Sequence, residues 1–253
     1  MVLGQHVSPL PAGVIGLHAG ASFAAADFLQ VILHGRGAHG SRPEVSVDPV
    51  VMAAATVMRL QTVVSREVGG ADMAVLTVGA LRAGTKENII PDSAELLIGI
   101  RTVEPSVRDI VLAAVERIVN GEAITAGAPK PPDVTVTGSF PAVVNDAEAI
   151  ERIRPAFAEQ FGAAQIVDPG RLAASEDVGI LATAAGVPCV YWLLGGADPQ
   201  AFAGAADMAA IQAVIAKLPS NHSPLFAPVI EPTLTNGVAA LTLAARTWLP
   251  AAS

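Results

Sequence analysis

The amino-acid sequence predicts an α/β protein in which one domain is inserted within another. Short runs of β-branched and apolar residues alternate with segments of helical periodicity, and the pattern changes near residues 24 and 143. With 253 residues, of which 52% are hydrophobic, the chain can fill two cores of ordinary size. We expect residues 1–23 and 144–253 to form one domain and residues 24–143 the other.

The central segment alternates strand and helix signals. In order, these predict a strand at 28–33, a helix from Asp48–Pro49 to Gly69, strands at 73–80 and 94–100, a helix capped by Ser106 and ending near Gly121, and a half-buried strand around Val134 and Val136. The resulting order β-α-β-β-α-β is that of the ferredoxin-like unit, a four-stranded antiparallel sheet with two helices on one face.

The flanking segments predict the second α/β layer. Residues 2–16 indicate the end of a strand that runs into a loop, because prolines and a glycine interrupt an apolar stretch. A helix is expected at 146–161, a buried strand at 187–194 and a final helix at 232–248.

Composition excludes several classes of function. No apolar run reaches the roughly 18 to 20 residues of a membrane span, and no secretory signal is recognisable, so we expect a soluble cytoplasmic protein without a membrane partner. The net charge is −8 without a Lys/Arg stripe, which argues against a nucleic-acid partner. The single cysteine, Cys189, lies in the predicted buried strand and is interpreted as a structural thiol.

Two histidines stand beside glycine or proline in loops. His6 lies between Gly4 and Pro9, and His222 precedes Ser223 and Pro224. A histidine at a strand end can direct its imidazole into a cleft and bind a metal ion. An ordinary surface or core histidine is the alternative, and the distance between the two in the sequence offers no local ligand spacing.

Six short motifs appear in a characteristic order along the whole chain. They are Gly4-x-His6-x-x-Pro9, Gly37-Ala38-His39 followed by Asp48-Pro49, Asn88-Ile89-Ile90-Pro91, Ile100-Arg101-Thr102, Ser175-Glu176-Asp177, and His222-Ser223-Pro224-Leu225-Phe226. In this order they resemble the metal-dependent amidohydrolases that include hippurate hydrolase and indoleacetyl-amino-acid hydrolase, within the aminoacylase and carboxypeptidase superfamily of metallopeptidases. The resemblance implies a co-catalytic metallopeptidase α/β domain whose inserted ferredoxin-like domain serves as a lid and dimerisation domain.

The resemblance also implies a site and a reaction. Two divalent ions, zinc or manganese, would activate a water that hydrolyses the amide of an N-acyl amino acid or related small molecule. His6 and His222 would be metal ligands, and His39 would stabilise the oxyanion, often in the partner subunit of a homodimer. Asn88 and Arg101 would hold the amide and carboxylate of the substrate.

Glu176 and Asp177 are adjacent carboxylates. Their side chains diverge, so a supporting or helix-capping role is favoured over direct binding of a metal ion.

Two motifs of the family pattern are missing from this sequence. A Cys/His-Gly-His-Asp cluster and a Glu-Glu pair do not occur in these 253 residues. We therefore expect a C-terminal portion that is incomplete or inactive by itself; a non-enzymatic dimerisation or small-ligand-binding remnant is the alternative.

Overall fold

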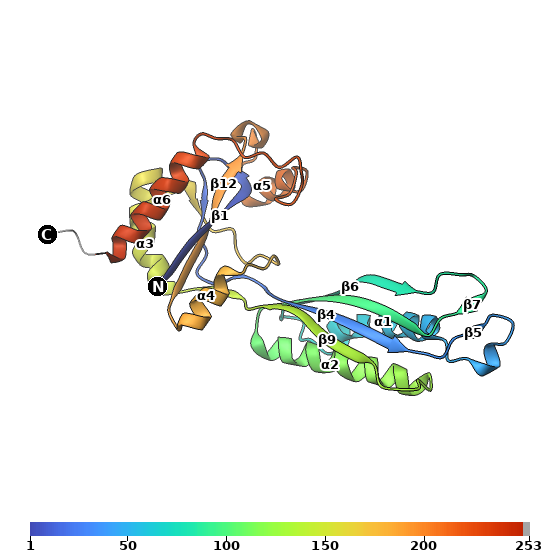
Figure 1. Ribbon diagram of the computed structural model, residues 1–253. Helices are drawn as coiled ribbons and strands as arrows, with labels where there is room; N and C mark the ends of the chain where they lie inside the picture. Colours follow the sequence, from blue (N-terminus) through green and yellow to red (C-terminus); the bar gives the residue numbers. More distant parts are fainter. Residues whose placement is uncertain (250–253) are drawn as a thin grey trace. The chain divides into compact units, whose positions relative to one another are not determined.

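The computed structural model describes residues 1–249, so the last four positions of the predicted segment 144–253 lie outside the described residues. The chain divides into two compact units (Figure 1). Residues 24–142 form the inserted unit, and residues 1–23 with those from 143 onward form the discontinuous unit. The predicted second boundary falls one residue later.

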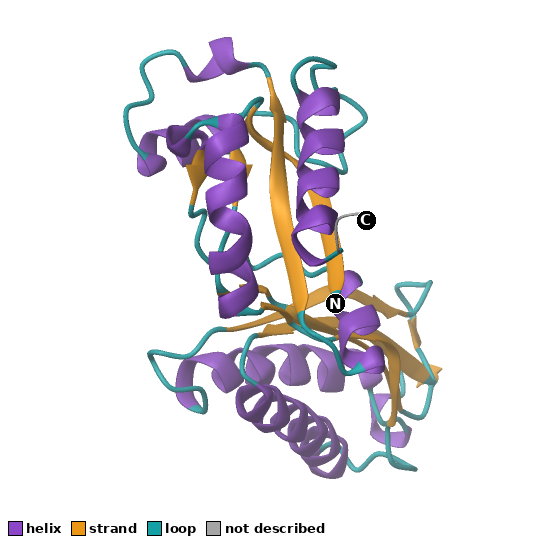
Figure 2. Ribbon diagram, turned by 90° about the vertical axis from the view of Figure 1, so that its left-hand side faces the viewer, coloured by secondary structure: helices purple, strands orange, loops and turns teal. Residues whose placement is uncertain are grey.

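The inserted unit has the predicted β-α-β-β-α-β order. Its elements are β4 (Ala25–His34), β5 (Ala38–His39), a 3-10 turn η1 (Pro43–Val45), α1 (Pro49–Arg66), β6 (Ala74–Ala83), β7 (Ile89–Ile90), β8 (Ser93–Thr102), α2 (Pro105–Thr125) and β9 (Asp133–Phe140). The four long strands form an antiparallel sheet in the order β6-β8-β4-β9, and β5 pairs with β7 separately. Both helices lie side by side on one face of this sheet (Figure 2).

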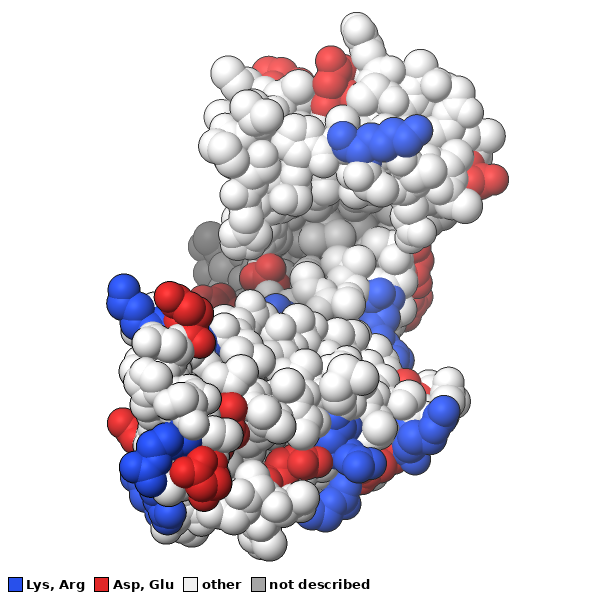
Figure 3. All heavy atoms as spheres, turned by 90° about the vertical axis from the view of Figure 1, so that its right-hand side faces the viewer, with Lys and Arg blue, Asp and Glu red and all other residues white. Residues whose placement is uncertain are grey.

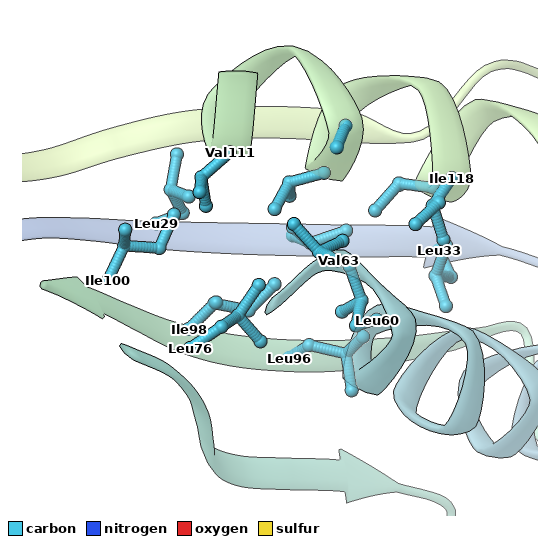
Figure 4. Packing of buried hydrophobic residues seen from close by; sticks show 14 of the residues in the cluster. Leu29, Leu33, Leu60, Val63, Leu76, Leu96, Ile98, Ile100, Val111 and Ile118 are labelled. Atoms are coloured by element: carbon cyan, nitrogen blue, oxygen red, sulfur yellow. The ribbon is translucent and has the colours of Figure 1, made fainter. Parts of the chain in front are cut away.

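Alternating side chains build the core of the inserted unit. Leu29, Leu33, Leu96, Ile98 and Ile100 point from the sheet toward the helices (Figure 4). Apolar residues of α1 and α2 at helical spacing meet them, so both faces of the interface are buried. Leu60, Val63, Val111 and Ile118 are the helical residues labelled in that view.

Three local predictions in this unit are wrong. Ser106 does not cap α2: the helix begins at Pro105, which is suited to the first helical position, with Glu104 as N-cap. The helix continues beyond Gly121 to Thr125, because Ala123 still packs in the core. The last strand is present, but Val134 and Val136 lie at the outer edge of the sheet and are 37% and 56% exposed rather than half-buried.

Gly121 therefore sits inside an exposed helical turn, and a methyl group placed on it would meet no atom within 4 Å. We expect Gly121→Ala to stabilise the protein by about 1 kcal/mol, because alanine restricts the unfolded chain and favours the helix. Urea unfolding followed by circular dichroism measures this. An unchanged or lower midpoint would contradict it.

The discontinuous unit is a mixed α/β layer. Its elements are β1 (Val2–Pro11), β2 (Ile15–Gly16), β3 (Gly20–Phe23), β10 (Val143–Asn145), α3 (Ala147–Phe161), η2 (Ala163–Gln165), β11 (Ile166–Val167), α4 (Val178–Ala185), β12 (Cys189–Ala197), η3 (Pro199–Phe202), α5 (Met208–Ile215) and α6 (Thr233–Trp248). Six strands form one sheet in the order β11-β2-β12-β10-β3, with β1 parallel to β12. The first strand is longer than expected, and helices α4 and α5 were not predicted.

The central strand β12 is buried on both faces, which explains its continuous apolar sequence. Val190, Trp192 and Leu194 pack in the cluster that includes α3 and α6. Cys189, Tyr191 and Leu193 face the opposite cluster, which receives Val178 of α4 and residues of α5. Because parallel strands in register share faces, β12 also decides which side of the sheet each β1 side chain occupies.

No helix within residues 1–249 is long and apolar enough to span a bilayer. On the face seen in Figure 3, acidic and basic side chains are interspersed rather than segregated. This face therefore has no strong field of one sign that would attract a polyanion.

Candidate metal centre

Strand register places His6 on the α4/α5 face of the discontinuous unit. His6 pairs with Leu193, and Gly4 pairs with Tyr191, so all four positions share that face. Gln5, one position away, points to the other side, where its Oε1 accepts a hydrogen bond from the indole nitrogen of Trp192 at 3.1 Å. The alternation along β1 thus turns the imidazole away from the α3/α6 core.

Hydrogen bonding assigns the tautomer of His6. Its Nδ1 lies 2.6 Å from the carbonyl oxygen of Val7, which can only accept, so Nδ1 carries a proton. Nε2 then presents its lone pair, the form of histidine that binds a metal. The side-chain amide of Asn221 donates to the same carbonyl oxygen at 2.7 Å and connects this strand with the segment that carries His222.

A carboxylate faces this lone pair. Glu176 Oε1 lies 3.7 Å from His6 Nε2, too far for a hydrogen bond. Glu176 Oε2 accepts a hydrogen bond from the phenol of Tyr191 at 3.3 Å. Burial and the nearby charge of Glu176 raise the pKa of Tyr191, so the phenol remains a neutral donor.

Gly4 permits this arrangement. A Cβ atom at position 4 would lie 2.9 Å from the Tyr191 ring, so any larger residue would displace the ring that holds Glu176. The glycine of the Gly-x-His motif therefore has a physical function. The sequence held no signal for Tyr191, which is one apolar-run residue among several, whereas Asn221 could have been found as the neighbour of His222.

Both predicted metal ligands line one cavity of about 550 Å³. His6, Glu176, Asn221 and His222 line it, although His6 and His222 lie near opposite ends of the chain. The side chain of Asp177, by contrast, makes no capping hydrogen bond although the residue is the N-cap of α4.

The residues present fit a divalent ion only in part. Zinc ligands lie about 2.0 to 2.2 Å from the metal, so two of them can be up to about 4 Å apart, and the His6–Glu176 separation is compatible with one shared ion. A catalytic ion normally has about three protein ligands. Within residues 1–249, no three His, Cys, Asp or Glu side chains are grouped to hold an ion.

The remaining predicted site residues belong to the inserted unit. His39 is exposed on β5. The backbone N–H of Ser41 donates a hydrogen bond to His39 Nδ1 at 3.2 Å, so the proton of the neutral imidazole is on Nε2, which can donate a hydrogen bond. Asn88 is in the turn before β7, and its carbonyl oxygen accepts from Gly40 N at 2.7 Å. The guanidinium of Arg101 lies 5.7 Å from the centre of the Phe28 ring.

His39 and Asn88 lie together, but Arg101 does not join them. β5 comes shortly after His34, the last residue of β4, and β7 comes shortly before Ser93, the first residue of β8, which is paired with His34. Arg101, by contrast, is next to the last residue of β8. At roughly 3.3 Å per residue, β8 is about 30 Å long. In one molecule these side chains cannot contact one small substrate.

The other titratable side chains in question have structural partners. His18 Nδ1 lies 2.7 Å from Asp168, and His34 Nε2 lies 2.8 Å from Asp133. Cys189 is buried, and burial raises the pKa of its thiol. The two histidines thus have structural partners, and the burial of Cys189 agrees with its interpretation as a structural thiol.

Comparisons with known proteins relate the inserted unit to a family of domains. Residues 25–126 match the family model of the peptidase dimerisation domain. The inserted unit is therefore similar to this domain. Solved structures share the fold over most of this chain. A dinuclear metal-binding peptidase of the M20 family from Bacillus subtilis aligns with a TM-score of 0.60 at 25% identity, over 85% of this chain and 56% of that one. A Staphylococcus aureus protein aligns with a TM-score of 0.75 at 24% identity, over 96% of this chain and 57% of that one.

Curated relatives that this chain matches include deacetylases. The chain is 33% identical over 167 residues to N-acetylcysteine deacetylase of Bacillus subtilis, which covers 63% of this chain and 44% of the relative. It is 40% identical over 122 residues to N-acetyldiaminopimelate deacetylase of Anoxybacillus flavithermus, covering 48% and 32%. The chain thus spans less than half the length of these relatives. The predicted α/β fold with a peptidase dimerisation domain is confirmed.

Proposed function

We propose that this chain is part of a metal-dependent amidohydrolase that cleaves the amide bond of N-acyl amino acids or related amides. One observation carries the proposal: His6 Nε2 faces Glu176 in a cavity that His222 also lines. Similarity to deacetylases of N-acetyl amino acids supports the amide chemistry.

In this proposal His6 and His222 hold divalent metal, zinc or manganese. A bound ion would lower the pKa of a water molecule and polarise the scissile carbonyl. Asn221 would keep His6 oriented through the carbonyl that both side chains share, and Tyr191 would hold Glu176 beside the site. Further ligands and the general base would come from residues outside these 253.

The inserted unit would complete the site from two subunits of a homodimer. His39, with its proton on Nε2, suits hydrogen bonding to an oxyanion. Arg101 suits bidentate binding of the substrate carboxylate, and Asn88 suits the amide. Because His39 and Asn88 lie about 30 Å along the sheet from Arg101, one substrate could meet all three only if two subunits contribute.

Hydrolysis of N-acyl amino acids tests the proposal. We expect a protein that includes any in-frame coding sequence upstream of Met1 to release amino acid from such substrates when Zn²⁺ or Mn²⁺ is supplied, and to lose this activity on chelation. The 253-residue chain alone is the matched control, with activity at least about a hundredfold lower because metal ligands would be absent. Absence of hydrolysis from the longer, metal-loaded protein would reject the proposal and favour the non-enzymatic alternative.

A further inference from the structure

Asn145 is a buried polar residue that the proposed chemistry does not use. It is the last residue of β10 and is 1% exposed. Its side-chain Oδ1 accepts a hydrogen bond from the backbone N–H of Tyr191 at 2.7 Å. Its Nδ2 donates to the carbonyl oxygens of Tyr191 and His18, each at 2.8 Å. Only this orientation of the amide suits all three partners, because the N–H group needs an acceptor and the two carbonyls need donors.

The amide of Asn145 fills a break along one edge of β12. β1 occupies the other edge, whereas β10 pairs with β12 at Cys189 and β2 pairs with it at Leu193 and Leu194. Tyr191 lies between these positions, and no strand of residues 1–249 pairs with it on this edge. A side-chain amide has the donor and acceptor groups of a peptide, so Asn145 replaces the missing strand and satisfies both buried backbone groups of Tyr191.

Tyr191 connects this anchor to the candidate metal centre. Its ring packs edge-to-face on Phe23 with 5.4 Å between the ring centres, and Gly4 lies so close that an added Cβ would meet the ring at 2.9 Å. The phenol donates to Glu176 Oε2 at 3.3 Å, while Oε1 of the same carboxylate faces His6 Nε2 at 3.7 Å. Because Phe23 and Gly4 confine the ring, a displaced Tyr191 backbone would carry the hydroxyl away from Glu176. The bond is already long, so a small displacement would break it.

A purely structural role for Asn145 is the alternative. Thr233 gives an example of such a role in the same unit: it is 7% exposed, and its hydroxyl donates to the carbonyl oxygen of Gly195 in β12 at 3.2 Å. Both side chains therefore stabilise the backbone of β12. They differ in that Asn145 holds the residue whose side chain bonds Glu176, whereas Thr233 does not.

We propose that Asn145 is a positioning residue of the candidate metal centre. By holding the backbone of Tyr191, it keeps the Tyr191 hydroxyl on Glu176 and the Glu176 carboxylate beside His6. The inference rests on the proposed function, since it takes His6 and Glu176 as parts of the reacting site. It extends that site to a residue that does not line the cavity.

The NMR signal of Tyr191 tests this inference without metal or hydrolysis, because Tyr191 is the single tyrosine of the sequence. Tyrosine labelled with carbon-13 at Cζ gives one signal in the 253-residue chain. Glu176→Gln replaces the carboxylate acceptor with an amide, which accepts a weaker hydrogen bond, and so defines the direction in which the signal moves. We expect Asn145→Ala to move the signal in that direction or to broaden it.

Thr233→Val is the matched control, because it removes a buried hydrogen bond to the same strand and should leave the Tyr191 signal in place. Asn145→Ser is a second variant in case alanine prevents folding. Its smaller side chain leaves room for a water molecule that can bond the freed backbone groups without fixing their position. An unchanged signal in a folded Asn145 variant, an equal change in Thr233→Val, or unfolding of both Asn145 variants would assign a structural role and overturn the inference.

Zinc binding by the longer protein, which includes any in-frame sequence upstream of Met1, separates this inference from the proposed function. We expect Asn145→Ser to weaken Zn²⁺ binding about tenfold, the lower end of the effect of residues that support a metal ligand, and Thr233→Val to leave it unchanged. A moved Tyr191 signal without zinc binding in any variant would retain the link from Asn145 to Glu176 and reject the metal centre. Zinc binding that Asn145→Ser leaves unchanged would retain the metal centre and overturn the inference.

Discussion

Asp27→Ala is expected to destabilise the protein by about 3 kcal/mol. Asp27 is 1% exposed and receives three hydrogen bonds: two from the Arg108 guanidinium and one from the Ser139 hydroxyl, each at 2.7 Å. The substitution removes the acceptor that links β4, α2 and β9. Breaking a buried ion pair costs about 3 to 5 kcal/mol, and the lower end applies because Arg108 is 34% exposed and regains some hydration.

Asp109→Ala is the matched control for this effect. Asp109 also lies near Arg108, at 4.0 Å, but its side chain is 76% exposed. Its removal should change the free energy of unfolding by less than about 0.5 kcal/mol. Both tryptophans, Trp192 and Trp248, lie in the discontinuous unit, so far-UV circular dichroism in urea is the suitable signal. Equal losses in the two variants would contradict the account.

The fold of the inserted unit could be predicted because its sequence patterns involve residues close together in the chain. Period-two strands and the apolar spacing of α1 and α2 follow from neighbouring residues, as does the Asp48 cap that accepts a hydrogen bond from Val50 N. The exposure of Val134 and Val136 was not local information. It depends on β9 forming the edge of the sheet, which the sequence of β9 alone does not specify.

The candidate site depended on contacts between distant segments. No spacing connects His6 with Glu176 or with Asn221; the pairing of β1 with β12 and the path of the final loop bring them together. The motif resemblance identified His6 and His222, and their roles stay predictions. Glu176 was expected to play a supporting or capping part rather than to bind a metal ion directly. Its carboxylate lies 3.7 Å from His6 Nε2, and its role stays a prediction.

His6→Ala is expected to produce the largest functional effect, a loss of at least about a hundredfold in affinity for Zn²⁺ or Mn²⁺. Replacing even an outer-shell partner of a metal ligand typically costs 10- to 100-fold in affinity, so removing a ligand should cost no less. The imidazole is hydrogen-bonded to the carbonyl oxygen of Val7 and faces Glu176.

His18→Ala supplies the control, because His18 belongs to the same unit but contacts Asp168 and does not line the cavity. It removes an imidazole that offers the same nonspecific affinity for metal ions. Any general loss of surface metal binding would therefore appear in both variants, and only loss of the proposed centre would be confined to His6→Ala.

The most direct test of the metal centre is calorimetric titration of Zn²⁺ into metal-free protein that includes any in-frame sequence upstream of Met1, compared among wild type, His6→Ala and His18→Ala. The account predicts one wild-type affinity that His18→Ala retains and His6→Ala loses by at least about a hundredfold. Equal affinities of wild type and His6→Ala would contradict it.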